Sequence, residues 1–194
     1  MKNLSFDESI SYKPDFIDIQ AADKLFEQLH EHLDWRQDKI KLYGRNLSIP
    51  RLQAFIAHKG VRYTYSGLTL EGNGFPEPLE QLRCDLNQVT GVEFNAVLAN
   101  LYRDGSDTMG WHSDNEPELG PDPVIASITL GANRSFKFRP IGGGASWGID
   151  LEHGSLLLMG AGVQQRWQHS IPKRLRCNQP RINLTFRKII SRSN

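Results

Sequence analysis

The chain has 194 residues, of which 39% are hydrophobic and 23% are charged, and its formal net charge is +1. This length suits one domain with a substantial core, and the composition excludes a fibrous or disordered protein. The longest apolar stretch, residues 156–163, is too short to span a membrane, and Asp7 and Glu8 lie where a secretory signal would be apolar.

The first half of the chain contains two amphipathic patterns that predict helices. The earlier pattern consists of apolar residues at helical spacing, namely Leu25, Phe26, Leu29 and Leu33. The later one begins at Pro78, because proline is favoured in the first turn of a helix, and continues through Leu79, Leu82, Leu86 and Val89. Both predicted helices precede the part of the chain that is rich in strands.

From Phe94 onward the pattern changes to short strand-like runs separated by Gly, Pro, Asp and Asn. The runs are 96–102, 124–130, 135–139, 155–159 and 181–190. The three glycines at 142–144 predict a hairpin loop, because no helix pattern follows them as a nucleotide-binding glycine motif would require. Together the elements predict a mainly β (α+β) fold with a closed or sandwiched antiparallel sheet, in a single domain covering residues 1–194.

A candidate metal site begins at His112-Ser-Asp114. In extended backbone, residues two apart project from the same face, so the imidazole and the carboxylate would lie together. A second histidine would complete a two-histidine, one-carboxylate triad, which leaves positions open on iron for an organic cosubstrate and oxygen. His169 is the best-placed candidate, because the other histidines fall in a charged helix or in turns. The competing interpretation is a surface histidine beside a turn aspartate.

The last predicted strand alternates strictly between polar and apolar residues. Its polar face consists of Arg181, Asn183, Thr185 and Arg187. These side chains point either to water or into a polar cavity lined by the sheet. In a cavity, the planar guanidinium of Arg181 would hold the distal carboxylate of a dicarboxylate. Arg187 lies about 20 Å further along an ideal strand, so it reaches the same molecule only if the strand twists, or it meets the metal end instead.

A set of short motifs between Leu42 and Ile189 occurs together. The motifs are Tyr63-Thr-Tyr-Ser-Gly-Leu-Thr69, Phe94-Asn95, Asn100-Leu-Tyr102, His112-Ser-Asp-Asn-Glu116, Ile125-Ala-Ser127, His153-Gly-Ser-Leu-Leu157, His169-Ser170 and Arg181-Ile-Asn-Leu-Thr-Phe-Arg187. With these motifs the chain resembles the AlkB family of iron(II)- and 2-oxoglutarate-dependent dioxygenases, in particular its members that repair alkylated DNA. The combination is highly specific.

The resemblance implies a double-stranded β-helix, or jelly-roll, core over about residues 94–190, with flanking helices on its N-terminal side. It implies that iron(II) is held by the catalytic residues His112, Asp114 and His169. The residues implied to hold 2-oxoglutarate are Asn100, Tyr102, Arg181, Asn183, Thr185 and Arg187. Molecular oxygen is the other cosubstrate.

The family also implies a nucleobase-recognition region over about residues 42–70. The residues expected to contact the substrate are Tyr43, Gly44, Arg45, Tyr63, Thr64, Tyr65, Asn115 and Glu116. The first three resemble a finger that fills the gap left by an extruded base, the next three a wall beside that base, and the last two its exocyclic edge. Ordinary packing and turn roles are the alternatives for these residues.

Basic residues gather near the end of the chain, where eight Lys or Arg and no Asp or Glu follow Glu152. Lys173, Arg174 and Arg176 would attract the phosphates of nucleic acid, and a solvated surface is the alternative. The expected partner is alkylated DNA, with RNA as an option. We expect a monomer that binds no membrane and is not secreted, cytoplasmic in a bacterium or nuclear in a eukaryote.

The expected reaction is oxidative demethylation of N-alkylated bases in DNA, such as 1-methyladenine and 3-methylcytosine. It would release formaldehyde and would be coupled to the decarboxylation of 2-oxoglutarate to succinate. The first alternative is the same chemistry on RNA or on a protein side chain. The others are a non-catalytic jelly-roll binding module and a domain that only binds nucleic acid.

Overall fold

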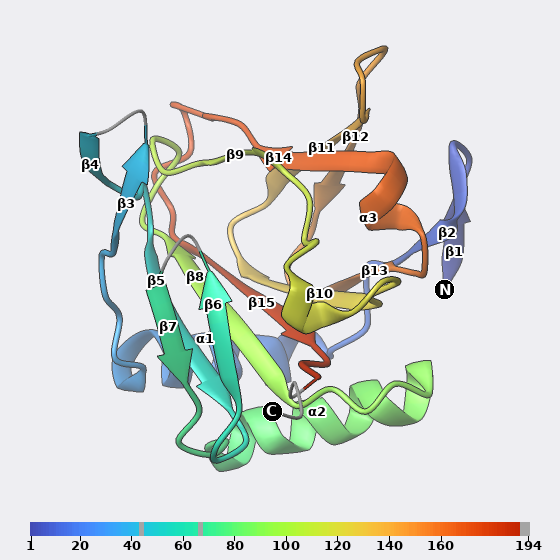
Figure 1. The fold of residues 1–194 in the computed structure, drawn as a ribbon. Helices are drawn as coiled ribbons and strands as arrows, with labels where there is room; N and C mark the ends of the chain where they lie inside the picture. The colour runs from blue at the N-terminus through green and yellow to red at the C-terminus, as the bar shows by residue number, and fades with distance from the viewer. Residues whose placement is uncertain (43–44, 66–67, 191–194) are drawn as a thin grey trace.

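Two antiparallel sheets lie on either side of the molecular interior in this computed structural model (Figure 1). The structure describes residues 1–42, 45–65 and 68–190, and at 40–42, 45–46, 65 and 68 it describes the backbone alone. The larger sheet has seven strands, in the order β1 (Lys2–Leu4), β2 (Asp7–Lys13), β13 (Ser155–Met159), β10 (Ile125–Gly131), β15 (Arg181–Arg187), β8 (Ala96–Tyr102) and β5 (Leu52–Ala57).

The smaller sheet has four strands, in the order β12 (Trp147–Leu151), β11 (Arg134–Pro140), β14 (Trp167–Ile171) and β9 (Met109–His112). From β8 to β15 the chain passes repeatedly between the sheets, and β15 lies between β8 and β10, which are far from it in sequence. This winding is that of a double-stranded β-helix. The predicted fold class is therefore confirmed.

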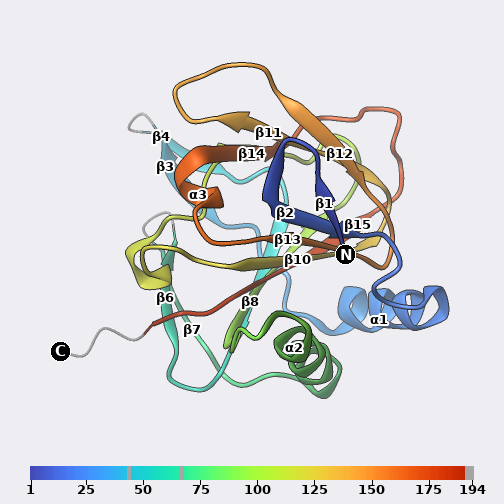
Figure 2. The ribbon, with the colours of Figure 1, turned by 90° about the vertical axis from the view of Figure 1, so that its right-hand side faces the viewer.

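Two long helices cover one face of the larger sheet, on the lower side of the molecule in Figure 1 and again in the turned view of Figure 2. The first, α1 (Ile19–His32), begins at Asp18, whose carboxylate accepts from the amide of Gln20 at 3.0 Å. The second, α2 (Glu77–Thr90), follows Pro76 and ends at Gly91 with a φ of 70°. Their buried residues are Ala22, Leu25, Leu29, Leu79, Leu82 and Leu86. Both helices were predicted.

Smaller elements complete the described chain. Two hairpins, β3 (Lys39–Leu42) with β4 (Arg45–Ser48) and β6 (Arg62–Tyr65) with β7 (Leu68–Glu71), lie outside the two main sheets. A 3-10 turn, η1 (Pro117–Leu119), follows β9, and the one-turn helix α3 (Val163–Arg166) connects β13 to β14. Within the described ranges, no helix has both the length and the apolar character needed to cross a membrane.

The predicted strands match the observed ones closely. Strands 96–102 and 155–159 coincide with β8 and β13, whereas the last strand ends at Arg187, three residues before its predicted end. The glycines at 142–144 connect β11 to β12 and all have positive φ, between 92° and 133°, as the predicted hairpin loop requires.

Strand β15 is buried on both faces. Ile182, Leu184 and Phe186 pack with the helices in the main hydrophobic core. The alternate residues Arg181 and Arg187 face the opposite way, toward the smaller sheet, and are 0% and 5% exposed. Of the two predicted environments for the polar face, the structure therefore shows the cavity rather than water.

Candidate metal and cosubstrate site

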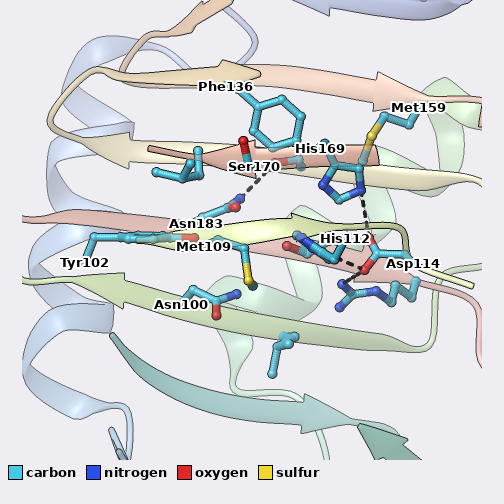
Figure 3. A pocket seen from close by; sticks show the side chains of 15 residues that line it. Asn100, Tyr102, Met109, His112, Asp114, Phe136, Met159, His169, Ser170 and Asn183 are labelled. Atoms are coloured by element: carbon cyan, nitrogen blue, oxygen red, sulfur yellow. Dashed lines mark hydrogen bonds and ion pairs between the residues drawn. The ribbon is translucent and has the colours of Figure 1, made fainter. Parts of the chain in front are cut away.

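Three residues converge on one point, two from strands of the smaller sheet and one from the segment that follows β9. His112 ends β9 and pairs directly with His169 in β14, and their ring centroids are 4.3 Å apart. The Nε2 atoms of His112 and His169 lie 4.0 and 3.9 Å from carboxylate oxygens of Asp114. One ligand atom from each of the three lies within 4.8 Å of the others, and Figure 3 shows the side chains pointing toward one another. The structure thus brings the predicted triad together.

The protonation states of the triad suit a divalent cation. Burial lowers the pKa of His112 and takes that of His169 to about 3. Burial alone would raise the pKa of Asp114, but Arg187 and the two histidines hold it at about 2. At neutral pH the site therefore offers two neutral imidazoles and a carboxylate, which is the donor set that iron(II) binds. His112 Nδ1 donates to the carbonyl of Gly110 at 2.9 Å, which leaves Nε2 free to accept a metal.

Arg187 lies at the metal end of the cavity. Its Nη2 donates to Asp114 Oδ1 at 2.8 Å, and both side chains are buried. Burial would lower the pKa of the guanidinium, but the adjacent carboxylate raises it above its ordinary value. Of the two positions predicted for Arg187, the structure shows the one at the metal end.

A cavity extends from the triad between the two sheets. Its walls include five of the six residues expected to hold 2-oxoglutarate, namely Asn100, Tyr102, Asn183, Thr185 and Arg187. Apolar side chains from both sheets complete the lining, including Leu98, Phe136 and Ile171. Figure 3 shows the polar side chains of β8 and β15 on one side and Phe136 with His169 on the other. The cavity therefore combines a polar row from β8 and β15 with apolar side chains from both sheets.

Arg181 marks the end of this polar row that lies away from the metal. It is 0% exposed, its Nη2 donates to Thr129 Oγ1 at 2.8 Å, and its guanidinium lies 5.3 Å from the ring centre of Tyr102. Nε and Nη1 have no hydrogen-bond partner among the described residues, and burial lowers the pKa of Arg181 to about 10. A buried cation without a carboxylate partner is the complement of an anionic ligand.

The sequence reasoning missed several polar residues around the cavity. Ser127 and Thr129 lie on β10 and contact Asn183 and Arg181, each at 2.8 Å. Their alternation along the predicted strand could have revealed them. Arg51 is buried and donates to Asn100 Oδ1 at 2.8 Å, and no local pattern indicated its role.

Only part of the predicted substrate region is at the triad. Tyr63 is 1% exposed, its ring lies 5.8 Å from the Arg187 guanidinium, and burial, with Glu116 nearby, raises the pKa of its hydroxyl. Burial and Asp114 raise the pKa of Glu116. Thr64 and Asn115 are exposed. Tyr43 and Gly44 lie outside the described residues, as do the side chains of Arg45 and Tyr65.

The family model described as the 2OG-Fe(II) oxygenase superfamily matches residues 9–187. DNA oxidative demethylase ALKBH2 from Mus musculus is 41% identical in an alignment 180 positions long that covers 87% of this chain and 75% of that protein. The chain belongs to the AlkB family of this superfamily. The predicted resemblance is thereby confirmed.

Other relatives agree with this placement in the AlkB family. Alpha-ketoglutarate-dependent dioxygenase alkB homolog 3 from Bos taurus is 40% identical in an alignment 186 positions long that covers 91% of this chain and 64% of that protein. The same protein from Homo sapiens is 39% identical, and this chain again spans 64% of its length. A solved structure titled "The structure of OsALKBH1" superposes with a TM-score of 0.61 at 15% identity, covering 93% of this chain and 98% of the other, and it shows the shared fold.

The superfamily uses iron(II), 2-oxoglutarate and oxygen, and the site fits these groups. The triad supplies the nitrogen and oxygen donors for iron(II), with an ionised Asp114. Arg181 supplies an unsatisfied guanidinium for a carboxylate at the far end of the same polar row. The AlkB cosubstrate is a dicarboxylate, and the polar row has the triad near one end and Arg181 at the other.

Proposed function

We propose that this chain removes alkyl groups from N-alkylated bases in DNA, such as 1-methyladenine and 3-methylcytosine, by oxidation. The methyl carbon would leave as formaldehyde, while 2-oxoglutarate and oxygen are converted to succinate and carbon dioxide. The observation that carries the proposal is the convergence of His112, Asp114 and His169 at one end of a polar row whose other end is Arg181, a buried guanidinium with two nitrogens left without a hydrogen-bond partner among the described residues. The names of the mouse and cattle relatives support the reaction class.

The roles of the cavity residues follow from their positions. Iron(II), held by the triad, would supply the power to activate oxygen, and no side-chain nucleophile is needed. Arg181 would bind the distal carboxylate of 2-oxoglutarate, and Asn183 and Thr185 would line its path to the metal end. Arg187 would keep Asp114 ionised and fix the direction of its carboxylate through their 2.8 Å hydrogen bond.

The apolar wall of the cavity would exclude water from the reacting groups. Phe136 is 5% exposed and its ring stacks on His169 with centroids 5.2 Å apart, which holds the imidazole in place. Leu98 is 2% exposed and lies on the opposite sheet. A dry site strengthens the electrostatic interactions within it and protects a reactive oxidant from side reactions.

The alkylated base would approach the triad from the side of Tyr63 and Glu116. The Tyr63 hydroxyl and Glu116, whose pKa is raised by burial, place a polar, protonatable edge beside Asp114, suited to reading the polar edge of a base. The residues proposed to complete the contact are Tyr43, Gly44, Arg45, Thr64, Tyr65 and Asn115. We place this recognition region at about residues 42–70, within one domain of residues 1–194.

The nucleic-acid backbone would contact the basic segment between β14 and β15. Lys173, Arg174 and Arg176 are exposed, and Arg174 donates to the carbonyl of Asn133 at 2.9 Å. Such residues bind phosphates without reading sequence. We further propose that the protein acts as a monomer in the compartment that holds the DNA, the bacterial cytoplasm or the eukaryotic nucleus.

The test is to incubate the protein with iron(II), 2-oxoglutarate and oligonucleotides carrying 1-methyladenine or 3-methylcytosine. Single-stranded DNA, duplex DNA and RNA of the same sequence are compared by mass spectrometry, and His112→Ala serves as the inactive control. A loss of one methylene equivalent from DNA, absent with His112→Ala, supports the proposal. Turnover of RNA alone would redirect it to RNA, and no mass change on any substrate would reject it.

A further inference from the structure

The one-turn helix α3 carries a buried side chain that contacts two of the proposed metal ligands at once. Gln164 is 2% exposed. Its Oε1 accepts from the backbone amide of Asp114 at 2.9 Å and lies 3.2 Å from His169 Nε2. Its Nε2 lies 3.6 Å from the sulfur of Met159, another residue of the cavity wall. A single amide therefore connects residues from three separate segments of the chain.

The orientation of this amide is fixed by chemistry. A backbone N–H can only donate, so the Gln164 atom that faces the amide of Asp114 must be the oxygen. The same oxygen faces His169 Nε2, so without a metal that nitrogen carries the hydrogen. His112 is held in the opposite way, because its Nδ1 donates to Gly110 and its Nε2 is left open.

The backbone around Asp114 needs such a contact because the sheet ends before it. Strand β9 stops at His112, and its pairing with β14 is confined to the stretch around His169 and Ile171. Beyond that point two side-chain contacts replace the ladder. Ser113 donates to the carbonyl of Trp167 at 2.8 Å, and Gln164 accepts from Asp114. Of the two, only the Gln164 contact also reaches a histidine of the triad.

We propose that Gln164 is the positioning residue of the metal site. It holds the backbone of Asp114 where the strand no longer can. In the metal-free protein its oxygen also accepts from His169 Nε2, a hydrogen bond that gives way when that nitrogen takes a metal. The triad is thereby assembled before the metal arrives. This inference rests on the proposed function, since it concerns the site that would hold iron(II). Hydrogen bonds behind a ligand, such as the one to the Asp114 backbone, fix the direction in which that ligand meets a metal.

The test compares two neighbouring glutamines. Gln164→Met keeps the length of the side chain and removes the acceptor. Gln165→Met is the matched control, because Gln165 lies on the same turn but is exposed and donates to Pro121 and Asp122 at 2.8 and 2.9 Å. The probe is cobalt(II), whose affinity is measured by calorimetry and whose visible absorption reports the ligand geometry. Hydrogen exchange of the Asp114 amide is measured in the metal-free proteins.

We expect Gln164→Met to weaken cobalt(II) binding by about 10- to 100-fold, to change the visible spectrum and to speed exchange of the Asp114 amide. Gln165→Met should match the wild type in all three. Equal cobalt(II) affinity in the wild type and Gln164→Met overturns this inference alone. A wild type that binds no cobalt(II) overturns both this inference and the proposed metal site, so the two failures are distinguishable.

A second variant covers the case in which Gln164→Met does not fold. Gln164→Glu retains an oxygen that can accept from the Asp114 amide and adds a negative charge beside the cation. We expect it to bind cobalt(II) at least as tightly as the wild type. If Gln164→Glu, which keeps the acceptor, bound cobalt(II) more than about tenfold more weakly than the wild type, the positioning role would be overturned.

Discussion

The two ends of strand β15 carry the same residue in opposite electrostatic situations. Arg187 and Arg181 are six positions apart on one face of the strand, and both are buried. Arg187 has a carboxylate partner in Asp114, which raises its pKa. Arg181 has the hydroxyl of Thr129 and the ring of Tyr102, and its pKa is lowered to about 10 by burial.

The Arg187 charge stabilises the fold through its ion pair, whereas the Arg181 charge has no anionic partner among the described residues. A buried ion pair is costly to break, because removing one member leaves the other uncompensated. A buried cation with no anion beside it only costs stability until a ligand supplies the anion. The Arg187 end is therefore complete within the protein, and the Arg181 end is completed by the cosubstrate.

The largest expected effect is on stability, at the Arg187 end. Arg187→Met strands the buried carboxylate of Asp114, and we expect the free energy of unfolding to fall by about 3–5 kcal/mol. Urea unfolding of the metal-free protein measures it. The double variant Arg187→Met with Asp114→Asn should recover part of the loss. A single variant as stable as the wild type would show that the pair is not needed by the fold.

The next effect is on cosubstrate binding, at the Arg181 end. Arg181→Met removes the proposed partner of the distal carboxylate, and we expect 2-oxoglutarate affinity to fall by about 2–5 kcal/mol, roughly 30- to 5,000-fold. Manganese(II) affinity should not change. Unlike Arg187→Met, this variant should be no less stable than the wild type without cosubstrate. Loss of metal binding in Arg181→Met would contradict the division between the two ends.

The stability of the protein at acidic pH reports on the metal end rather than on Arg181, because the Arg181 guanidinium stays protonated at acidic pH. The ordinary histidine pKa is 6.5 and burial takes that of His169 to about 3, so between these values the unfolded chain binds more protons. The free energy of unfolding of the metal-free protein should therefore fall as pH is lowered from 6.5 toward 3. Asp114 adds a second loss between its ordinary pKa of 3.8 and its folded value of about 2. Urea midpoints across this range should show a shallower slope for His169→Asn, and an unchanged slope would count against a buried neutral imidazole.

A smaller effect is expected where the base would bind. Tyr63→Phe removes the buried hydroxyl that lies near Glu116, and a polar contact between this hydroxyl and a base would contribute about 0.5–1.5 kcal/mol. We expect a higher KM for methylated oligonucleotide and an unchanged affinity for 2-oxoglutarate. Steady-state kinetics with a fixed oligonucleotide measure both, and Phe55→Leu, which alters the ring stacked on Tyr63 at 5.9 Å, is a packing control. If only the affinity for 2-oxoglutarate changed, Tyr63 would contact the cosubstrate rather than the substrate.

The smallest effect is expected on the surface. Lys173→Ala should weaken oligonucleotide binding equally for all sequences and reduce the slope of log affinity against log salt by about 1. Binding measured at several salt concentrations tests this. Exposed Lys188, which pairs with Glu93 at 3.2 Å, provides a control, and Lys188→Ala should leave the slope unchanged. A change of slope with Lys188→Ala and none with Lys173→Ala would place the phosphate contacts elsewhere.

The sequence predicted well whatever depends on local periodicity. Alternation along 181–187 predicted a strand with a polar face, and H-x-D predicted an imidazole and a carboxylate on one side of an extended segment. It did not decide whether the polar face met water or a cavity, because that depends on a second sheet formed by distant strands. Gln164 was missed for the same reason. Its one-turn helix has no pattern of its own, and its role comes from a loop 50 residues away.

The most direct test is the binding of 2-oxoglutarate, followed by calorimetry, to manganese(II)-loaded wild type, Arg181→Met and Arg181→Lys. We predict tight binding by the wild type, loss of most of the affinity in Arg181→Met, and partial retention in Arg181→Lys, which keeps the charge but not the planar fork. Equal affinity in all three proteins would contradict the assignment of the unpaired guanidinium to the cosubstrate, and with it the two-ended site.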